Sequence, residues 1–420
     1  MKARLWLLLG LLACGISGLY MHRILGPWEY YVNVEHGRLK AALGDLYPRW
    51  VGTRDLLLYG RNPYGREVSR EIQIGFYGHE IVQDHEHLGP DPIDEQRFAY
   101  PVYVVLLLAP TVRADFQALN AGAWWVLAGL TAVSVLLWMT VLHWRPAWPV
   151  AICIILFILS SPQIVQALRL RQLALLVSFL LALSSWCILR GHLTIAGALL
   201  ALSTIKPQMV AVVLLWFLLW TLGNFAQRWK LAASFCGSLA LLIGVGEILL
   251  PGWVRDFLAG IAAYRKYFPT TSLLRFTLGD TIGTAAGIAI VIGLLIFAWK
   301  NWAREESWDQ FVVALSAFFV ATSLVLPLMV PANQVLLLLP LLATLKNWPA
   351  QRRFTRLTLF TIAAWPSIAA LVLLLVPPNV QSMSRLPLLP SALVLLVPFA
   401  VPVWLMTRRA ETSPAAAPAR

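Results

Sequence analysis

Apolar runs separated by short polar turns occupy most of this 420-residue sequence. A run of about 20 apolar residues is long enough to cross the hydrocarbon core of a membrane as a helix. The first run ends near residue 20, and the next one of full length covers residues 121–142. The pattern therefore predicts an all-α polytopic membrane protein with about 12 transmembrane helices. The further spans that it predicts are residues 148–160, 173–189, 193–205, 209–222, 231–250, 281–298, 311–326, 335–345, 357–376 and 388–406.

Polar segments divide the predicted bundle into successive parts. Residues 1–24 are expected to be an uncleaved N-terminal transmembrane anchor, and residues 25–99 a long first extracytoplasmic loop. The remaining parts are expected to be a membrane bundle at residues 100–250 and 281–407, an extracytoplasmic amphipathic loop at residues 251–280, and a disordered cytoplasmic tail at residues 408–420.

The composition agrees with a membrane protein, because 59% of the residues are hydrophobic and only 13% are charged. Soluble domains have roughly 25% charged residues. The net charge of +13 comes from Lys and Arg residues scattered over short turns, which argues against nucleic acid as a partner. Placing the N-terminus inside puts most of these cations on one side, as the positive-inside rule requires. We therefore expect a multi-pass plasma-membrane protein with both termini in the cytoplasm.

The cysteines and histidines do not form a recognisable metal motif. All four cysteines lie within apolar stretches, where a thiol is expected to be a small buried hydrophobe. His85 and His87 could hold a cation, but a solvated loop is the plainer interpretation. We expect no metal and no cofactor.

Acidic residues are concentrated in the first polar region, since 12 of the 20 lie between residues 26 and 98. Carboxylates are costly in hydrocarbon and are kept where water or chemistry needs them. Most of these are expected to solvate the loop. Asp45 is the candidate general base, because it lies beside the first span and is followed by Tyr47 and Arg49. Asp55, ten residues on, is expected to lie on a helix surface.

Few cations fall in the short turns on the predicted extracytoplasmic side, against the general bias, and three of them are informative. Arg169 and Arg171 precede one span, and Lys206 lies at a helix break caused by Pro207. A break exposes backbone groups that a ligand can satisfy, so these three cations are candidates for binding a phosphate. The alternative is that each is a long side chain at a helix end with its charge in water.

Amides near these cations are candidates for contacting sugar hydroxyl groups. Gln172 and Gln208 lie at predicted span ends, where the alternative is an amide bonded to the helix backbone. Asn333 and Gln334 form a polar pair in a turn flanked by prolines, and a turn role is the default for them.

Five motifs occur in a characteristic order along the first half of the chain. They are GDLYPRW, LLLYGRNPY, FAYPVYVVLLLAP, RQLALL and STIKPQ. In order and spacing, this half resembles glycosyltransferase family 87, the polyprenyl-phosphate-mannose-dependent mannosyltransferases of the GT-C fold. The resemblance covers residues 1–225 by motif and the remainder by hydropathy.

The resemblance implies a GT-C-like bundle with Asp45 as general base and with Tyr47, Tyr64, Gln172 and Gln208 contacting substrate. The implied donor is a polyprenyl-phosphate hexose, with mannose as the sugar, and the acceptor is a glycolipid or glycan on the extracytoplasmic face. Membrane lipids surround the enzyme as its other partners. The implied reaction agrees with the residues, since a carboxylate can deprotonate the acceptor while cations stabilise the leaving phosphate.

Two other classes of protein remain open from the sequence. A lipid or solute transporter would also have many spans, broken helices and intramembrane polar groups. The sequence lacks a visible internal repeat, which favours the enzyme over such a transporter. A non-catalytic membrane scaffold would have no need of Asp45 or Lys206.

Overall fold

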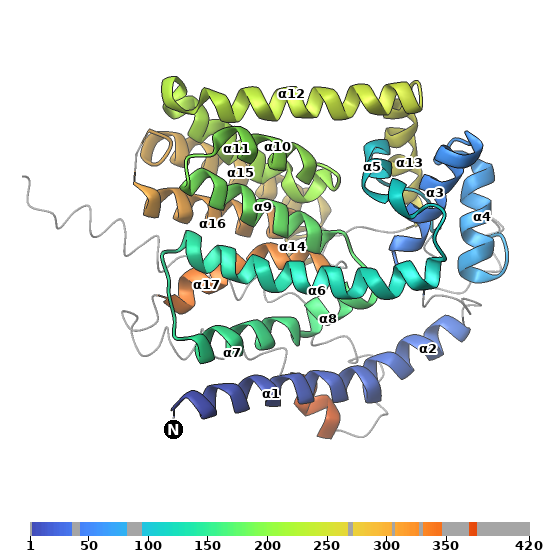
Figure 1. Ribbon diagram of the computed structural model, residues 1–420, viewed down its shortest axis with the longest axis horizontal. Coiled ribbons are helices and arrows are strands. Elements are labelled where there is room, and N and C mark those ends of the chain that lie inside the picture. The colour runs from blue at the N-terminus through green and yellow to red at the C-terminus, as the bar shows by residue number, and fades with distance from the viewer. Residues whose placement is uncertain are drawn as a thin grey trace, which may run out of the picture.

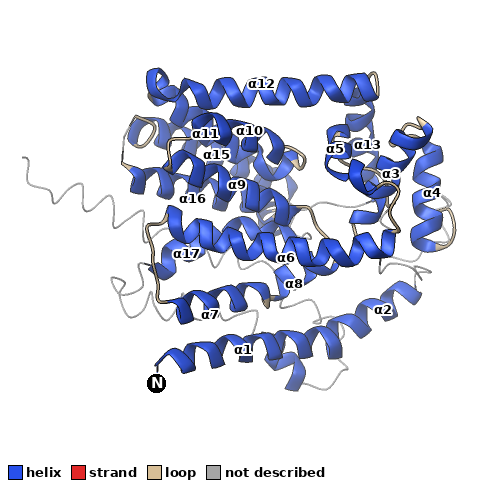
Figure 2. Cartoon of the chain, viewed as in Figure 1, coloured by secondary structure: helices blue, strands red, loops and turns tan. Residues whose placement is uncertain are grey.

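Every element in the described part of the chain is helical, as Figure 2 shows. The computed structural model describes residues 2–35, 43–81, 95–267, 272–304, 307–326, 331–346 and 369–375. In chain order the named elements are α1 (Lys2–Tyr20), η1 (Met21–Leu25), α2 (Gly26–Glu35), α3 (Leu46–Tyr59), α4 (Arg66–Tyr77), η3 (Val102–Val104), α5 (Val105–Leu108), η4 (Ala109–Thr111), α6 (Phe116–Val141), α7 (Trp148–Leu159), α8 (Pro162–Arg169), α9 (Ala174–Leu189), α10 (Leu193–Ser203), α11 (Pro207–Gly223), α12 (Phe225–Leu249), α13 (Trp253–Tyr267), α14 (Leu273–Leu278), α15 (Asp280–Asn301), α16 (Trp308–Val325), η5 (Pro331–Leu337) and α17 (Leu338–Lys346).

Five of the described helices are long and apolar enough to cross a membrane. A sixth span is added if α7 and α8, which meet at a bend of 61°, count as one. The predicted class of an all-α polytopic membrane protein is therefore confirmed. The five segments are Leu7–Tyr31, Phe116–Val141, Phe225–Leu249, Asp280–Asn301 and Trp308–Val325.

Several other apolar helices are too short to cross by themselves. The 11 residues of α10 extend for about 17 Å, roughly half of the 30 Å hydrocarbon core. The prediction of about 12 spans therefore stays a prediction. Two of its segments, residues 357–376 and 388–406, lie mostly or wholly outside the described residues.

The long helices lie lengthwise, and the polar helices gather at one end of them. Figure 1 shows α1, α6 and α12 running along the molecule, with α3, α4 and α13 together at the end away from the N-terminus. The inner helix is α16, in which 72% of the most apolar segment is buried. The corresponding share in α12, which lies at the edge, is 11%. The core around α16 is aromatic, since Trp216 stacks on Phe318 and Trp138 packs edge-on against Phe319. This core supports the helix ends that carry the polar residues.

The α3–α4 unit follows directly from its sequence pattern. Val68, Ile72 and Phe76 recur at helical spacing and are buried, as expected for an amphipathic helix. At Gly75 an added Cβ would overlap the hydroxyl group of Tyr47, so the absence of a side chain lets α4 pack closely on α3. The unit presents the start of α3 to the bundle.

Candidate active site

Asp45 is positioned by a glycine and by the end of α8. Gly44 has a φ of +71°, which glycine adopts without steric cost. The backbone N–H of Asp45 then donates to the carbonyl oxygen of Leu170 at 2.8 Å. A Cβ at Gly44 would lie 2.9 Å from that same oxygen. Glycine is therefore required for the start of α3 to approach the turn after α8 this closely.

The Asp45 carboxylate begins a chain of polar side chains that crosses the interior of the protein. It accepts a hydrogen bond from the Nε2 of Gln172. The Oε1 of Gln172 accepts from the Nζ of Lys206 at 3.1 Å, and Nζ also donates to the Oδ1 of Asn333 at 3.0 Å. Gln172, Lys206 and Asn333 are 6%, 5% and 6% exposed, so their contacts are shielded from bulk water. We call these four residues the polar chain.

Lys206 is the cation of the polar chain, and it lies in the turn between α10 and α11. Burial lowers its pKa to about 7, the Asp45 carboxylate acts to raise it, and Arg49 acts to lower it further. An ammonium group has three N–H donors. Two of them are used within the described residues, which leaves the third N–H without an acceptor among those residues.

Arg49 is a second cation at this site, four residues after Asp45 on α3. Its guanidinium donates to the backbone carbonyl oxygen of Asp45 at 2.5 Å and lies 4.5 Å from the centre of the Tyr100 ring. The one-turn spacing of Asp45 and Arg49 is visible in the sequence and could have indicated this contact. Arg49 and Asn333 are the site residues to which the sequence assigned no such role.

Arg169 and Arg171 use their guanidinium groups in other contacts. Arg169 lies 3.1 Å from the carboxylate of Glu29 on α2. Arg171 has a φ of +49° and donates to the backbone carbonyl oxygens of Asn120 at 3.0 Å and of Arg169 at 2.5 Å. To bind a phosphate as predicted, each guanidinium group would have to contact it in addition to its present partners, or replace one of those partners with it.

Three further residues are predicted to contact substrate: Tyr47, Tyr64 and Gln208. The Tyr47 ring packs 4.9 Å from that of Phe116, between α3 and α6. The Tyr64 hydroxyl group donates to the backbone carbonyl oxygen of Tyr100 at 2.6 Å, and Tyr100 also lies under Arg49. Gln208, at the start of α11, is exposed. Their predicted contacts with substrate stay predictions.

The expectation that Asp55 lies on a helix surface is wrong. Its side chain is 0% exposed and pairs with Arg61 at 2.9 Å, with Arg54 at 3.8 Å. Burial and the carboxylate of Glu71 raise the pKa of Asp55 to about 6, against the opposing effect of the two guanidinium groups. The reversal of the chain between α3 and α4 encloses Asp55, and a helical pattern read along α3 alone could not reveal that.

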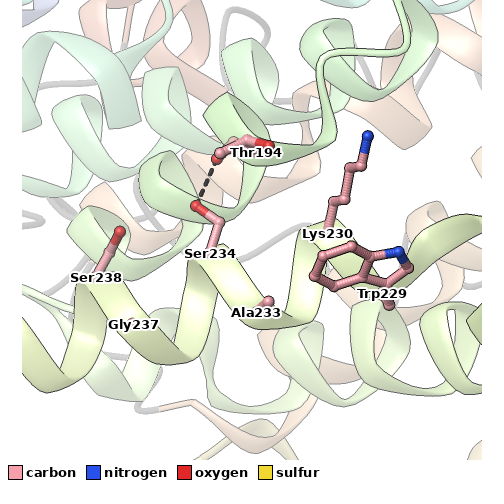
Figure 3. Close-up of a pocket in the computed structure, with 7 residues that line it drawn as sticks. All are labelled: Thr194, Trp229, Lys230, Ala233, Ser234, Gly237 and Ser238. Atoms are coloured by element: carbon pink, nitrogen blue, oxygen red, sulfur yellow. Dashed lines mark hydrogen bonds between the residues drawn. The ribbon is translucent and has the colours of Figure 1, made fainter.

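A cavity of about 490 Å³ lies between α10 and α12, away from the polar chain. Figure 3 shows that Thr194 lines it from α10 and that the other side chains come from α12. The Ser234 hydroxyl group donates to the backbone carbonyl oxygen of Thr194 at 2.6 Å. None of the predicted site residues is among the residues that line this cavity.

The apolar spans and the polar chain together define a polytopic membrane protein with a buried polar site. The model of glycosyltransferase family 87 matches residues 98–331, more than half of the chain, and the protein belongs to that family. It is therefore a glycosyltransferase. The matched segment contains Gln172 and Lys206, whereas Asp45 precedes it and Asn333 follows it by two residues. The comparison with curated proteins found no match, and the comparison with solved structures found none either.

Proposed function

We propose that the protein transfers a hexose, with mannose as the sugar, from a polyprenyl-phosphate donor to a glycolipid or glycan acceptor on the extracytoplasmic face of the plasma membrane. Asp45 is the general base in this proposal, and Lys206 contacts the donor phosphate. The observation that carries it is the linkage of Asp45 to Lys206 through Gln172. A base and a cation close to each other can act on the acceptor hydroxyl group and on the donor phosphate of one transfer reaction.

The proposed step moves one proton and exchanges one glycosidic bond. The Asp45 carboxylate accepts the proton of the acceptor hydroxyl group, whose oxygen attacks the anomeric carbon of the donor. The bond between that carbon and the phosphate oxygen breaks, and its electron pair leaves with the polyprenyl phosphate. Negative charge grows on this leaving group, where the remaining N–H donor of Lys206 can stabilise it.

The proposal is tested with the purified full-length protein in lipid vesicles. The donor is polyprenyl phosphate carrying a radiolabelled mannose, and transfer of label to a lipid or glycan extract is measured. Asp45→Asn keeps the shape of the side chain but removes the base, so we expect a loss of about 10²- to 10⁴-fold in rate. Asp115→Asn is the matched control, because Asp115 is an exposed helix cap and asparagine caps a helix equally well.

The same assay separates the enzyme from a transporter. Full transfer by Asp45→Asn would remove the proposed base. Movement of labelled donor across the bilayer without any transfer to acceptor would favour the transporter. For the donor contact, Lys206→Gln should weaken donor use by roughly ten- to a hundredfold, the value of a hydrogen bond to a charged group.

A further inference from the structure

Asn333 belongs to a segment that the sequence marks only as a turn, yet its side chain is buried inside the protein. It lies on η5, which packs against α8, α9 and α16. Its Oδ1 accepts a hydrogen bond from Lys206, which is 127 positions earlier in the sequence. A buried cation is stable only when acceptors surround it, and Asn333 supplies one of the two acceptors described for Lys206.

We infer that Asn333 is a positioning residue, which together with Gln172 holds the Lys206 ammonium group charged and directs its third N–H toward the phosphate of the sugar donor. The inference rests on the proposed function for the identity of the anion. That Asn333 stabilises the charged form of Lys206 depends only on the two hydrogen bonds.

The direction of the third N–H follows from the other two. Gln172 cannot turn its amide around, because its Nε2 faces a carboxylate that only accepts hydrogen bonds. Its Oε1 therefore remains on the side of Lys206. Asn333, on η5, accepts a second hydrogen bond from Lys206. Two of the three N–H directions of the tetrahedral nitrogen are therefore set, and the third has one direction left.

Asn333 can also influence whether Lys206 carries a proton. The charged groups that face Lys206 are Asp45, which favours the charged form, and Arg49, which opposes it. Burial opposes the charged form more strongly than either and lowers the pKa to about 7. The hydrogen bond that Lys206 donates to Asn333 favours the protonated form of the lysine, so replacing Asn333 should change the protonation of Lys206 in a predictable direction.

The first test measures this protonation without any catalysis. Lys206 has a pKa of about 7 in the folded protein and about 10.4 in an unfolded chain. The unfolded chain binds more protons between these values, so thermal stability rises with pH across this window. Lys206→Met should remove that rise. Asn333→Asp should raise the pKa of Lys206 in the folded protein by about one to three units, so stability should begin to rise at a higher pH. Asn333→Leu should lower this pKa, so stability should begin to rise at a lower pH.

The matched control is an asparagine that lies outside the polar chain. Asn301→Asp makes the same chemical change at an exposed residue at the end of α15, and it should leave the rise in place. If Asn333→Asp and Asn333→Leu both lower stability equally at every pH, Asn333 is only a turn residue and the inference is overturned. Opposite shifts of the rise in these two variants support it.

The second test measures sugar transfer against pH. A lysine that binds phosphate must be protonated, so the rate should fall as pH rises through its pKa. This alkaline fall should move to higher pH in Asn333→Asp and to lower pH in Asn333→Leu. If the stability shifts occur but the alkaline fall is the same in both variants, Asn333 does not position Lys206 for transfer. An absence of all transfer by the native protein would count against the proposed function, while the stability test would still decide whether Asn333 supports Lys206.

Discussion

The side-chain amide of Gln172 donates a hydrogen bond to the carboxylate of Asp45, although 127 positions separate them in the sequence. The same amide accepts a hydrogen bond from Lys206. One neutral side chain therefore connects the candidate base with the candidate phosphate-binding cation. Gln172 was expected to contact sugar hydroxyl groups, and the structure places it between two charged residues. This position makes it the most direct test of whether the polar chain works as a unit.

Gln172→Leu should lower the transfer rate by roughly ten- to a hundredfold, because hydrogen bonds to charged groups are worth about 1.5–3 kcal/mol. The change leaves Asp45 without its donor and Lys206 with one acceptor fewer. The kcat and the KM of each substrate would be measured in lipid vesicles. Gln117→Leu, at an exposed position of α6, is the matched control. A native rate in Gln172→Leu would contradict the linkage.

Gly44→Ala should reduce transfer by about a hundredfold, since a displacement of about 1 Å can cost that much in rate. The new Cβ would press on the carbonyl oxygen of Leu170 and move Asp45 away from Gln172. Gly78→Ala is the control, because Gly78 also has a positive φ, of +88°, but has open space around it. The Gly78→Ala variant should lose only about 1–2 kcal/mol of stability, the cost of an alanine in the left-handed backbone conformation. Equal rates in the two variants would show that the approach of Gly44 to Leu170 is unimportant.

Arg171→Gly should retain more transfer activity than Arg171→Ala. Both changes remove the guanidinium group, but only glycine adopts the φ of +49° without cost. The difference of about 1 kcal/mol corresponds to roughly a fivefold ratio in the equilibrium constant for forming the folded turn. Rates and thermal stability would be measured side by side. Equal losses, with a raised KM for the donor, would instead support the predicted contact of Arg171 with the donor phosphate.

Asp55 should make stability depend on pH in the acidic range. Its pKa of about 6 in the folded protein exceeds the value of about 3.9 in an unfolded chain. The folded protein therefore binds more protons between these values, and its stability falls as pH rises from about 4 to 6. The fall should amount to roughly 2–3 kcal/mol and should be absent in Asp55→Asn. Thermal unfolding in lipid nanodiscs checks this, with Asp115→Asn as control; an unchanged fall in Asp55→Asn would assign it to another group.

The predicted sidedness can be tested with cysteine labelling in a variant that lacks the native cysteines. Tyr59→Cys, at an exposed position at the end of α3, should react with a membrane-impermeant maleimide on intact cells. Ser307→Cys, exposed before α16, should react only after the cells are permeabilised. The reverse pattern would place Asp45 on the cytoplasmic side.

The sequence by itself determined the class of protein, the family and the residue types of the site. Apolar length is a local property, so the long spans could be predicted from residue order. The charges of Asp45 and Lys206 and the amide of Gln172 were noticeable because polar groups are costly beside apolar runs. The number of spans, the side of the membrane, the sugar and its donor, and the roles of the site residues stay predictions.

The tertiary structure decided which polar groups meet. Lys206 pairs with Gln172 and Asn333, which are 34 and 127 positions away, and Arg169 is held by Glu29. Asp55, expected at a surface, is buried. A buried polar group needs a partner, but any of several helix ends could supply it. Which one does depends on how the helices pack, and that packing is set by contacts between segments that no local pattern contains.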